Sequence, residues 1–434
     1  MTYKETIEFL YDHLPAYHRI GKAAYKADLH NSVFLDNYFG HPHKRFHSVH
    51  ITGTNGKGSV SHMIASILQE AGYKTGLYTS PHLKDYRERI RVNGKMISEE
   101  EVVFFVEKNR DILSKINPSF FEMSVAMAYD YFASCGVDVA VVEVGLGGRL
   151  DSTNIITPIL SVITNIGHDH MDLLGDTLEK VAAEKAGIIK DDIPAIVGEK
   201  QDTTDYVFIG KAARTYSELF FAEDYYKCIL EEPDHVSEYR EFNLIQTDKP
   251  VRLYGKIPLG GDYQVKNLPV VATAVELLRF KFNISGENFL NGVKNTVTNT
   301  GLRGRWQVLG LNPLIVCDTG HNREGLGYVI KQLGTIPKET LHIVIGFVSD
   351  KDISSVLPLF PEDARYYFTK ASVPRALDEK LLQITAKEND LKGESFISVE
   401  EAFNEAKRNA GEKDVIFVGG STFIVADLLL LLQC

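Results

Sequence analysis

Short apolar runs alternate with segments of helical spacing along most of this 434-residue chain. Four runs in the first half have the composition of strands buried on both faces: residues 48–52, 74–80, 137–144 and 158–166. Apolar side chains recur at helical spacing over residues 98–116, 121–135 and 175–188. This alternation predicts an α/β fold, in which helices cover a mostly parallel sheet.

A second series of the same kind begins after the sequence GLRGRW. Its expected strands are residues 314–320, 341–348, 365–369 and 414–420, with a helix near 323–334. The chain length also favours more than one domain, so we expect a larger domain over residues 1–300 and a smaller α/β domain over residues 301–434. Residues 200–256 are rich in Tyr, Glu and Asp and have little periodicity, which predicts short strands or excursions at the edge of the first domain.

The sequence HSVHITGTNGKGSVSHMIASILQEAG, residues 47–72, places a glycine-rich turn between a strand and a helix. The turn consists of Gly53, Thr54, Asn55, Gly56, Lys57, Gly58 and Ser59. Glycines let successive backbone N–H groups converge on one anion, and the helix N-terminus adds partial positive charge. Lys57 would neutralise β- and γ-phosphate oxygens, and the Ser59 hydroxyl would reach a phosphate-bound magnesium ion. The turn is therefore a candidate phosphate loop.

The spacing of this turn departs from the common G-x-x-x-x-G-K pattern, because Ile51 stands where the first glycine belongs. The competing interpretation is a glycine turn with a solvated lysine, but strand, loop, lysine, hydroxyl and helix all occur in the required order. A signalling GTPase should carry an N-K-x-D motif, and the chain contains DLLG at residues 172–175 without that partner. A nucleotide switch is therefore disfavoured.

Two further polar groups stand at expected strand ends. Glu143 ends the apolar run VDVAVVEV, just before a glycine-rich loop, and Ser80 ends the run KTGLYTS. Ligands of open parallel sheets collect outside the carboxyl ends of the strands. An unpaired buried carboxylate is costly, which favours Glu143 as a magnesium ligand. Ser80 would join that metal, or would simply cap a helix before Pro81.

The loop after the next strand, TNIGHDHMDLLG, gathers His168, Asp169, His170 and Asp172. No thiolates accompany these histidines, so one histidine is expected to bind a metal alongside oxygen donors. The helix that follows carries Lys185 near its end. Taken alone, Lys185 has the position of an ordinary solvated helix lysine.

Composition narrows the class of protein. The formal net charge of −11 argues against a nucleic-acid partner, whose phosphates attract a basic surface. Cysteine occurs four times at widely separated positions, which indicates a reducing compartment rather than a disulfide or zinc framework. The first residues lack a signal-peptide core, and the run FIVADLLLLL is too short to span a bilayer. We therefore expect a cytoplasmic protein without a membrane partner.

Several motifs together resemble the folylpolyglutamate synthase/dihydrofolate synthase branch of the Mur ligase superfamily. In chain order they are TGTNGKGS, TSPHL…ERIRVNG, EVGLGGRLDSTN, ITNIGHDHMDLLGDTLEKVAAEKAGIIK and DTGHNREG, and the resemblance spans roughly residues 48 to 350. The family's Gln-x-x-Asn element is matched by Gln264 and Asn267, but Leu268 and Pro269 follow where alanines are usual. The resemblance implies a P-loop ATPase-type domain, a smaller C-terminal domain and an active site in the cleft between them.

The resemblance also assigns roles to residues of this chain. ATP, as co-substrate, would be bound by the loop from Gly53 to Ser59 and by Asn267, Arg305, Asp318 and His321. The two expected Mg²⁺ ions would be held by Ser59, Ser80, Glu143, His170 and Lys185, the last as a carbamate. Carbamylation would turn the Lys185 cation into an anionic oxygen donor. The role that the resemblance implies for Lys185 thus replaces the interpretation of a solvated lysine. Lys57, His170 and Lys185 are the expected catalytic residues.

The reaction implied is ATP-driven amide formation, in which L-glutamate is joined to a reduced folate or to dihydropteroate through an acyl phosphate. Candidate folate-binding residues are Tyr86, Arg87, Arg89 and Phe121. A charged exposed strand would explain the first three equally well, and an aromatic at a helix start, such as Phe121, is more often part of the core. The resemblance implies a monomer. The resemblance favours a bifunctional enzyme, because one fold and one ATP site serve both reactions and many bacterial members perform both. The alternative is an enzyme that only extends glutamate tails, and no residue of this sequence decides between the two.

Two rival functions use the same sequence features. A UDP-sugar peptide Mur ligase would carry a nucleotide-sugar domain before its phosphate loop, and only 52 residues precede Gly53 here. A non-catalytic ATP-binding module would have no need of Glu143, His170 and Lys185 together. Both alternatives are disfavoured on these grounds.

Overall fold

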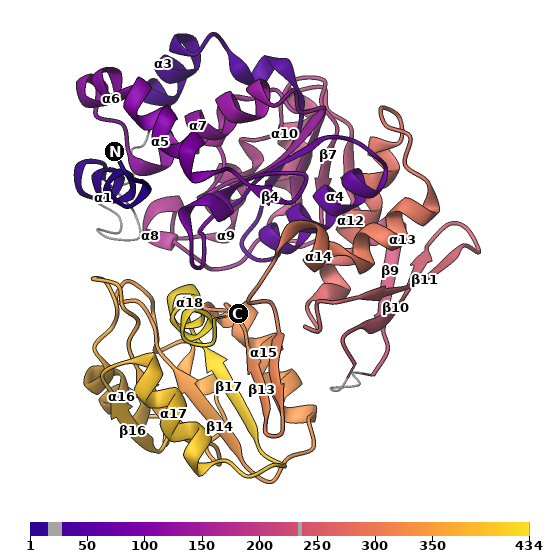
Figure 1. Cartoon of the computed structure of the whole chain (residues 1–434). Coiled ribbons are helices and arrows are strands. Elements are labelled where there is room, and N and C mark those ends of the chain that lie inside the picture. Colours follow the sequence, from indigo (N-terminus) through magenta and orange to yellow (C-terminus); the bar gives the residue numbers. More distant parts are fainter. Residues whose placement is uncertain (16–27, 233–236, 434) are drawn as a thin grey trace.

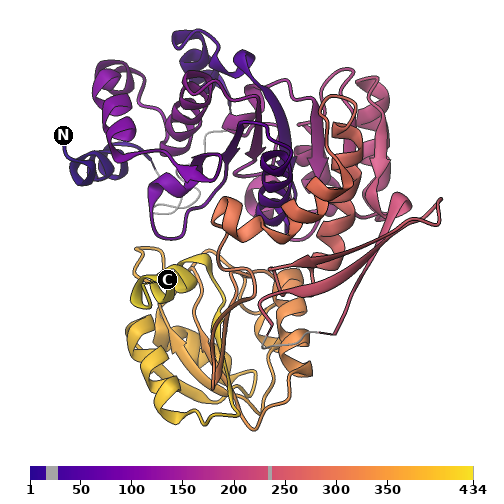
Figure 2. The same ribbon diagram turned by 45° about the vertical axis from the view of Figure 1, so that its right-hand side comes forward.

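A computed structural model describes residues 1–15, 28–232 and 237–433. Two α/β units, each built around its own sheet, lie one beside the other, and a small third sheet packs on the side of the N-terminal unit (Figures 1 and 2). The mostly parallel α/β architecture predicted from the alternation of apolar runs is confirmed.

The N-terminal unit contains an eight-stranded sheet with the order β4-β3-β2-β5-β1-β6-β7-β8. Strands β2, β5, β1, β6, β7 and β8 run parallel, and β3 and β4 extend one edge as antiparallel strands. The strands are β1 (His47–Thr52), β2 (Thr75–Tyr78), β3 (Ile90–Val92), β4 (Lys95–Met96), β5 (Val139–Glu143), β6 (Leu160–Ile163), β7 (Ala195–Val197) and β8 (Leu219–Phe221).

Helices cover both faces of this sheet, and the central strands are accordingly buried on both sides. One core is formed with α4 (Lys57–Glu70), α12 (Gln264–Leu278) and α13 (Gly286–Lys294). The opposite face is covered by α1 (Tyr3–His13), α3 (His30–Tyr38), α5 (Glu99–Lys108), α6 (Arg110–Ile116), α7 (Phe120–Ser134), α9 (Leu178–Ala186) and α10 (Asp205–Arg214). The short elements are α8 (Met171–Leu174), α11 (Ala222–Tyr225), α14 (Thr296–Thr300), η2 (Pro42–Arg45), η3 (Tyr86–Arg89) and η4 (Ser152–Ile155).

Residues 200–256 contain more regular structure than the sequence suggested. They form α10, the edge strand β8, α11 and most of a three-stranded antiparallel sheet with the order β11-β10-β9. That sheet consists of β9 (Tyr226–Leu230), β10 (Arg240–Gln246) and β11 (Arg252–Ile257). It packs against α12 and α13, so the expectation of short strands at the domain edge is confirmed, whereas the helix α10 was missed.

The C-terminal unit is a three-layer sandwich around a six-stranded sheet with the order β12-β13-β17-β14-β15-β16. Only β12 is antiparallel to its neighbour. The strands are β12 (Gln307–Leu311), β13 (Leu314–Cys317), β14 (Leu341–Ile345), β15 (Arg365–Thr369), β16 (Gly393–Phe396) and β17 (Val415–Gly419). Helices α15 (Arg323–Thr335) and α16 (Glu379–Lys387) cover one face with η5 (Leu357–Leu359), and α17 (Val399–Asn409) and α18 (Thr422–Leu431) cover the other.

Every strand and helix expected from periodicity in the C-terminal series is present, with ends shifted by a few residues. In the N-terminal series the single helix expected over residues 98–116 is two helices, α5 and α6, which are divided at Asn109. Within the described residues, the longest apolar helices are still too short to cross a bilayer.

Candidate active site

The phosphate loop lies where β1 ends and α4 begins, at the carboxyl edge of the parallel strands. Gly53 has φ +153° and Gly56 has φ +86°, conformations that L side chains rarely adopt. A Cβ on Gly53 would stand 1.8 Å from Thr164 Oγ1, and one on Gly56 would stand 2.4 Å from Asn267 Oδ1. Both glycines are therefore required by backbone conformation and by the close approach of neighbouring chains.

Lys57 folds back over this loop. Its Nζ donates to the carbonyl oxygens of Gly53 at 2.9 Å and of Thr54 at 3.2 Å. Burial lowers the pKa of Lys57, while the negative charges of Glu143 and Asp169 oppose that shift. The ammonium is thus held against the carbonyl oxygens of the glycine-rich loop.

Ser80 and Glu143 follow β2 and end β5, which are neighbouring strands. The backbone N–H of Ser80 donates to Glu143 Oε2 at 3.1 Å, and Glu143 is only 4% exposed. Burial raises the pKa of Glu143, and the nearby Lys57 ammonium opposes the rise. The buried carboxylate and the hydroxyls of Ser59 and Ser80 are hard oxygen donors, which fit a magnesium ion.

His170 and Lys185 come from the next loop and helix. His170 precedes α8 in a left-handed conformation, with φ 52°, and burial lowers its pKa to about 3, so its imidazole is neutral as a metal ligand must be. Lys185 is 3% exposed, and no hydrogen bond or ion pair joins its ammonium to any residue in the described part of the chain. Burial, followed by the charge of Lys57, lowers the pKa of Lys185 to about 7.

The C-terminal unit contributes a rigid acidic position. Asp318 follows β13, and its Oδ2 accepts hydrogen bonds from the Tyr263 hydroxyl at 2.6 Å and from the Trp306 N–H at 2.7 Å. Its Oδ1 accepts from the Gly320 N–H at 2.7 Å. Arg305 is held by the Thr319 hydroxyl close to this carboxylate. These contacts hold the Asp318 carboxylate and the Arg305 guanidinium in place, and both groups can form hydrogen bonds with a nucleotide.

All the predicted ATP and metal residues line one cavity of about 220 Å³ between the two units. These residues are Gly53, Thr54, Asn55, Gly56, Lys57, Gly58, Ser59, Ser80, Glu143, His170, Lys185, Asn267, Arg305, Asp318 and His321. The structure thus brings together groups separated by up to 268 positions, which run from Gly53 to His321.

A second cavity of about 230 Å³ adjoins the first and has mainly apolar walls. Its lining includes Phe120, Phe121, Leu146, Leu150 and Phe423. The two cavities share several lining residues, namely Ser80, Pro81, Gly145, Leu146, His170, His321 and Thr422. A molecule in the apolar cavity would therefore meet the phosphate site at this common wall.

The four candidate folate residues divide into two pairs. Arg89 and Phe121 line the apolar cavity, with Arg89 over the Phe120 ring at 5.2 Å. Tyr86 is not among the described lining residues, because it is 2% exposed and its hydroxyl donates to Ser124 Oγ at 3.1 Å. Arg87 is also outside that lining and instead forms hydrogen bonds with the Asp85 carboxylate.

Several lining residues escaped the sequence analysis as site residues. Asp169 was noted with the neighbouring histidines but given no role, and it contacts Lys351, His321 and Asn322 of the C-terminal unit. Arg375 and Lys351 place positive charge in the wall of the apolar cavity. Glu324 lines the phosphate cavity and belongs to the DTGHNREG motif, which could have suggested it, whereas nothing near Lys351 or Arg375 in the sequence marks a site.

Two family models match the chain. The Mur ligase middle domain matches residues 51–275, and the Mur ligase, glutamate ligase domain matches residues 304–422. Among curated proteins, the dihydrofolate synthase/folylpolyglutamate synthase of Bacillus subtilis (strain 168) is 32% identical over 403 residues, which cover 90% of this chain and 91% of that protein. A probable bifunctional folylpolyglutamate synthase/dihydropteroate synthase of Haloferax volcanii is 30% identical over 441 residues. That match covers 98% of this chain, which spans only 50% of the Haloferax protein.

Solved structures give the same result. A folylpolyglutamate synthase from Thermotoga maritima is 30% identical, with a TM-score of 0.81 over 99% of this chain and 96% of that one. The Escherichia coli FolC structure with DHPP and ADP is 27% identical, with a TM-score of 0.84 over 100% and 98% of the two chains. A bifunctional folylpolyglutamate synthase/dihydrofolate synthase with Mn, AMPPNP and L-glutamate bound is 27% identical, with a TM-score of 0.83 over 100% and 98%.

Proposed function

The chain belongs to the Mur ligase family, among its folylpolyglutamate and dihydrofolate synthases, and from this premise we propose its substrates and the roles of its residues. It is an ATP-dependent ligase that joins L-glutamate to folates and to dihydropteroate. The observation that carries the proposal is the shared wall between the phosphate cavity and the apolar cavity. At this wall, the carboxylate of a molecule bound in the apolar cavity can reach a phosphate group bound in the phosphate cavity.

In the first step a substrate carboxylate oxygen attacks the γ-phosphorus of ATP. The new O–P bond forms as the bond to the β-phosphate oxygen breaks, which gives an acyl phosphate and ADP. Catalysis of such a transfer depends on alignment and on neutralising charge. The loop from Gly53 to Ser59 holds the phosphates, and Lys57 balances the negative charge on the β- and γ-oxygens.

In the second step the amine of L-glutamate attacks the acyl carbon. The C–N amide bond forms, the bond to phosphate breaks, and the amine loses a proton as phosphate departs. Lys351 and Arg375, which reach the apolar cavity from the C-terminal unit, supply positive charge for the two carboxylates of glutamate. Closure of the two units around the site keeps water from the acyl phosphate.

Magnesium would neutralise and orient the phosphate oxygens when bound. The hydroxyls of Ser59 and Ser80 and the Glu143 carboxylate would hold one ion, and His170 with a carbamylated Lys185 would hold a second. Lys185 fits this modification because its lowered pKa, about 7, leaves much of the amine neutral and able to react with carbon dioxide. Asn267, Arg305, Asp318 and His321 would contact the nucleotide from the other side of the cavity.

Residues 1–300 would form the ATP-binding domain and residues 301–434 the domain that closes over it, with glutamate bound from the second domain. The name of the C-terminal family model, which matches residues 304–422, supports this division of labour. We further propose that the enzyme acts as a monomer in the cytoplasm and without a nucleic-acid partner, as its acidic composition favours.

The test is ADP release by purified protein with ATP, magnesium and L-glutamate, in parallel tubes that contain dihydropteroate or tetrahydrofolate. Turnover with both acceptors is the expected result. Turnover with tetrahydrofolate alone would restrict the enzyme to extending glutamate tails. If the protein binds ATP but releases no ADP with either acceptor, it is a non-catalytic ATP-binding module, and the proposal is overturned.

A further inference from the structure

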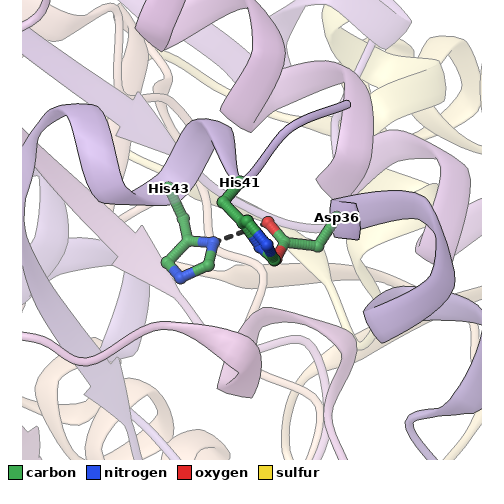
Figure 3. A group of neighbouring side chains, drawn as sticks. All are labelled: Asp36, His41 and His43. Atoms are coloured by element: carbon green, nitrogen blue, oxygen red, sulfur yellow. Dashed lines mark hydrogen bonds and ion pairs between the residues drawn. The ribbon is translucent and has the colours of Figure 1, made fainter. Parts of the chain in front are cut away.

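A compact group of Asp36, His41 and His43 lies away from the active site, where the chain leaves α3 and enters η2 (Figure 3). The Asp36 carboxylate binds both histidines, with its Oδ2 2.7 Å from His41 Nδ1 and its Oδ1 2.6 Å from His43 Nδ1. One ligand atom from each of the three side chains lies within 4.8 Å of the other two. The three groups therefore already converge.

The local backbone fixes this convergence. His41 has φ 55°, in the left-handed region, and Pro42 begins η2 directly after it. The His41 N–H donates to the Asp36 carbonyl oxygen at 2.8 Å, which closes the turn. The planes of the two imidazole rings stand at 90° to each other, so their nitrogens approach the carboxylate from different directions. Two imidazoles and a carboxylate that converge in this way have the arrangement of part of a metal coordination shell.

The group is separate from the magnesium site of the proposed function. It precedes β1, whereas the phosphate loop follows β1, so the length of a six-residue strand, about 20 Å, divides them. The donors also differ, because the active site offers mainly hard oxygens and this group offers two imidazoles and one carboxylate. Two imidazoles favour zinc or a similar transition metal over magnesium.

The burial of the three side chains suits a metal that can be reached from solvent. The Asp36 side chain is 8% exposed and that of His43 is 11% exposed, while that of His41 is 42% exposed. A buried carboxylate with two fixed partners is held in place, and the exposed imidazole provides a path for entry. Water would supply the remaining position of a four-coordinate site.

We propose that Asp36, His41 and His43 form a binding site for a divalent transition metal of the zinc class. In the metal-free state the Nδ1 atom of each imidazole is hydrogen-bonded to one oxygen of the carboxylate. On binding, the metal takes the two Nδ1 lone pairs and one carboxylate oxygen, and each imidazole carries its proton on Nε2. The ligand atoms must then move apart from 2.6–2.7 Å to about 3.3 Å, the separation in a tetrahedral zinc site, which small side-chain rotations supply.

The test uses the full-length protein without a histidine tag, titrated with Co²⁺ and with Zn²⁺ in excess Mg²⁺. Excess Mg²⁺ competes for the oxygen ligands of the active site, and Co²⁺ binding that is lost in the His41 and His43 variants is assigned to the new site. We expect one Co²⁺ per chain, with the visible absorption of a tetrahedral site, displacement by Zn²⁺, and a rise in the melting temperature on binding. His41→Gln and His43→Gln should each weaken Co²⁺ binding by about tenfold or more.

Two controls separate this site from its surroundings. His30→Gln removes an exposed histidine at the start of α3 and should leave Co²⁺ binding unchanged. Glu143→Gln alters the proposed magnesium site and should also leave the Co²⁺ signal of the Asp36 group unchanged. This outcome does not depend on the proposed ligase activity. Absence of Co²⁺ and Zn²⁺ binding by the wild-type protein would overturn the proposal and leave Asp36 as a hydrogen-bonded anchor for two histidines. Equal binding by His41→Gln and wild type would also overturn it, and since His41 is half exposed this variant should fold.

Discussion

Lys185 shows how an environment changes the chemistry of a residue that its sequence context makes ordinary. It lies in the last turn of α9, where a lysine usually faces solvent and favours the helix C-terminus. Here it is buried near the partly buried Lys57, and its pKa falls to about 7. The neutral amine that results is a nucleophile, which is the state that the proposed carbamylation requires.

Lys185→Ala should lower ligase turnover by on the order of 10²-fold or more, because a preorganised charge at the reacting phosphate is lost. A small carboxylate such as acetate should restore part of the rate by replacing the carbamate oxygens. Lys180→Ala, on the exposed side of the same helix, is the matched control and should keep full activity. Full activity of Lys185→Ala without acetate would exclude the carbamate.

Carbamylation itself should depend on pH with a predictable sign. Below pH 7 the Lys185 amine is increasingly protonated and cannot attack carbon dioxide, so the carbamate should decline as the pH falls. The check is the ¹³C NMR signal of the protein equilibrated with ¹³C-bicarbonate. That signal should be present at pH 8, weaken towards pH 6, and be missing from Lys185→Ala.

Phe121 tests the assignment of the apolar cavity. Its ring lies so close to Gly145 that a Cβ there would stand 2.4 Å from Phe121 Cζ, so the ring fills a defined part of the wall. Phe121→Ala should raise the KM for the folate or dihydropteroate by roughly tenfold or more, since burial of a phenylalanine contributes about 1.5–3 kcal/mol. The KM for ATP should not change. Phe104→Ala, a 59% exposed residue of α5, is the control, and an unchanged folate KM in Phe121→Ala would place the substrate elsewhere.

Site residues that are adjacent in the sequence could be predicted from it, whereas contacts between residues far apart in the sequence could not. The loop from Gly53 to Ser59 is one continuous turn, so its strand and helix contexts could be seen directly. The ion pair of Asp169 with Lys351 spans 182 positions. The histidines beside Asp169 mark its loop, but nothing near Lys351 in the sequence indicates that the two residues meet. Tyr86 and Arg87 have the right chemistry for a folate site, but packing turns the first into the core and pairs the second with Asp85.

At the scale of elements, the contact between α4 and α13 supports the phosphate loop from behind. Gly292 of α13 faces Ile67 of α4 so closely that a Cβ would stand 2.4 Å from Ile67 Cα. Ser66 Oγ also donates to the Gly292 carbonyl oxygen at 2.6 Å. The position of α4, and with it the direction in which its N-terminus points, depends on this close approach.

Gly292→Ala should therefore lower the free energy of unfolding by about 1–3 kcal/mol, because the added methyl group forces the two helices apart. Gly286→Ala is the matched control in the first turn of the same helix, where an added Cβ meets nothing within 4 Å. That variant should be neutral or slightly stabilising. Chemical denaturation of both variants provides the measurement, and equal stability would show that α13 can shift without cost.

The buried strands were predicted well because they lie in the middle of the sheets, are buried on both faces and are rich in Val and Ile. Periodicity failed for α10, of which only Phe208 and Ala212 are buried, since a helix with so narrow an apolar stripe has a weak pattern. It also joined α5 and α6 across Asn109, whose amide donates to the Phe105 carbonyl oxygen and ends the first helix. Hydrophobic periodicity therefore does not predict helices at the edge of the fold or helix ends that depend on a side-chain hydrogen bond.

At the scale of the whole molecule, polar contacts join the two units around the site, beside a few apolar ones made by Leu83 and Tyr263. The Asn55 and Asn322 amides bind each other at 3.2 Å and 3.0 Å, and the His168 N–H donates to Glu324 Oε1 at 3.1 Å. Asp169 forms the hub, because its carboxylate contacts His321 and Lys351 of the C-terminal unit at once. Polar interfaces of this kind separate more readily than apolar ones, so opening and closing of the units is the expected motion.

Asp169→Asn should shift the molecule towards the open arrangement, because it removes the charge that pairs with Lys351 and leaves that ammonium without its partner at the interface. Small-angle X-ray scattering without ligands should then give a larger radius of gyration than the wild type, and ATP with magnesium should reduce the difference. Asp176→Asn, which breaks only an exposed pair with Lys180, is the control and should scatter like the wild type. Scattering separates this effect from any direct effect on the neighbouring His170, since a lesion confined to catalysis would slow turnover without changing the size of the molecule. An unchanged radius with impaired turnover would therefore mean that Asp169 acts within the site and that other contacts hold the two units together.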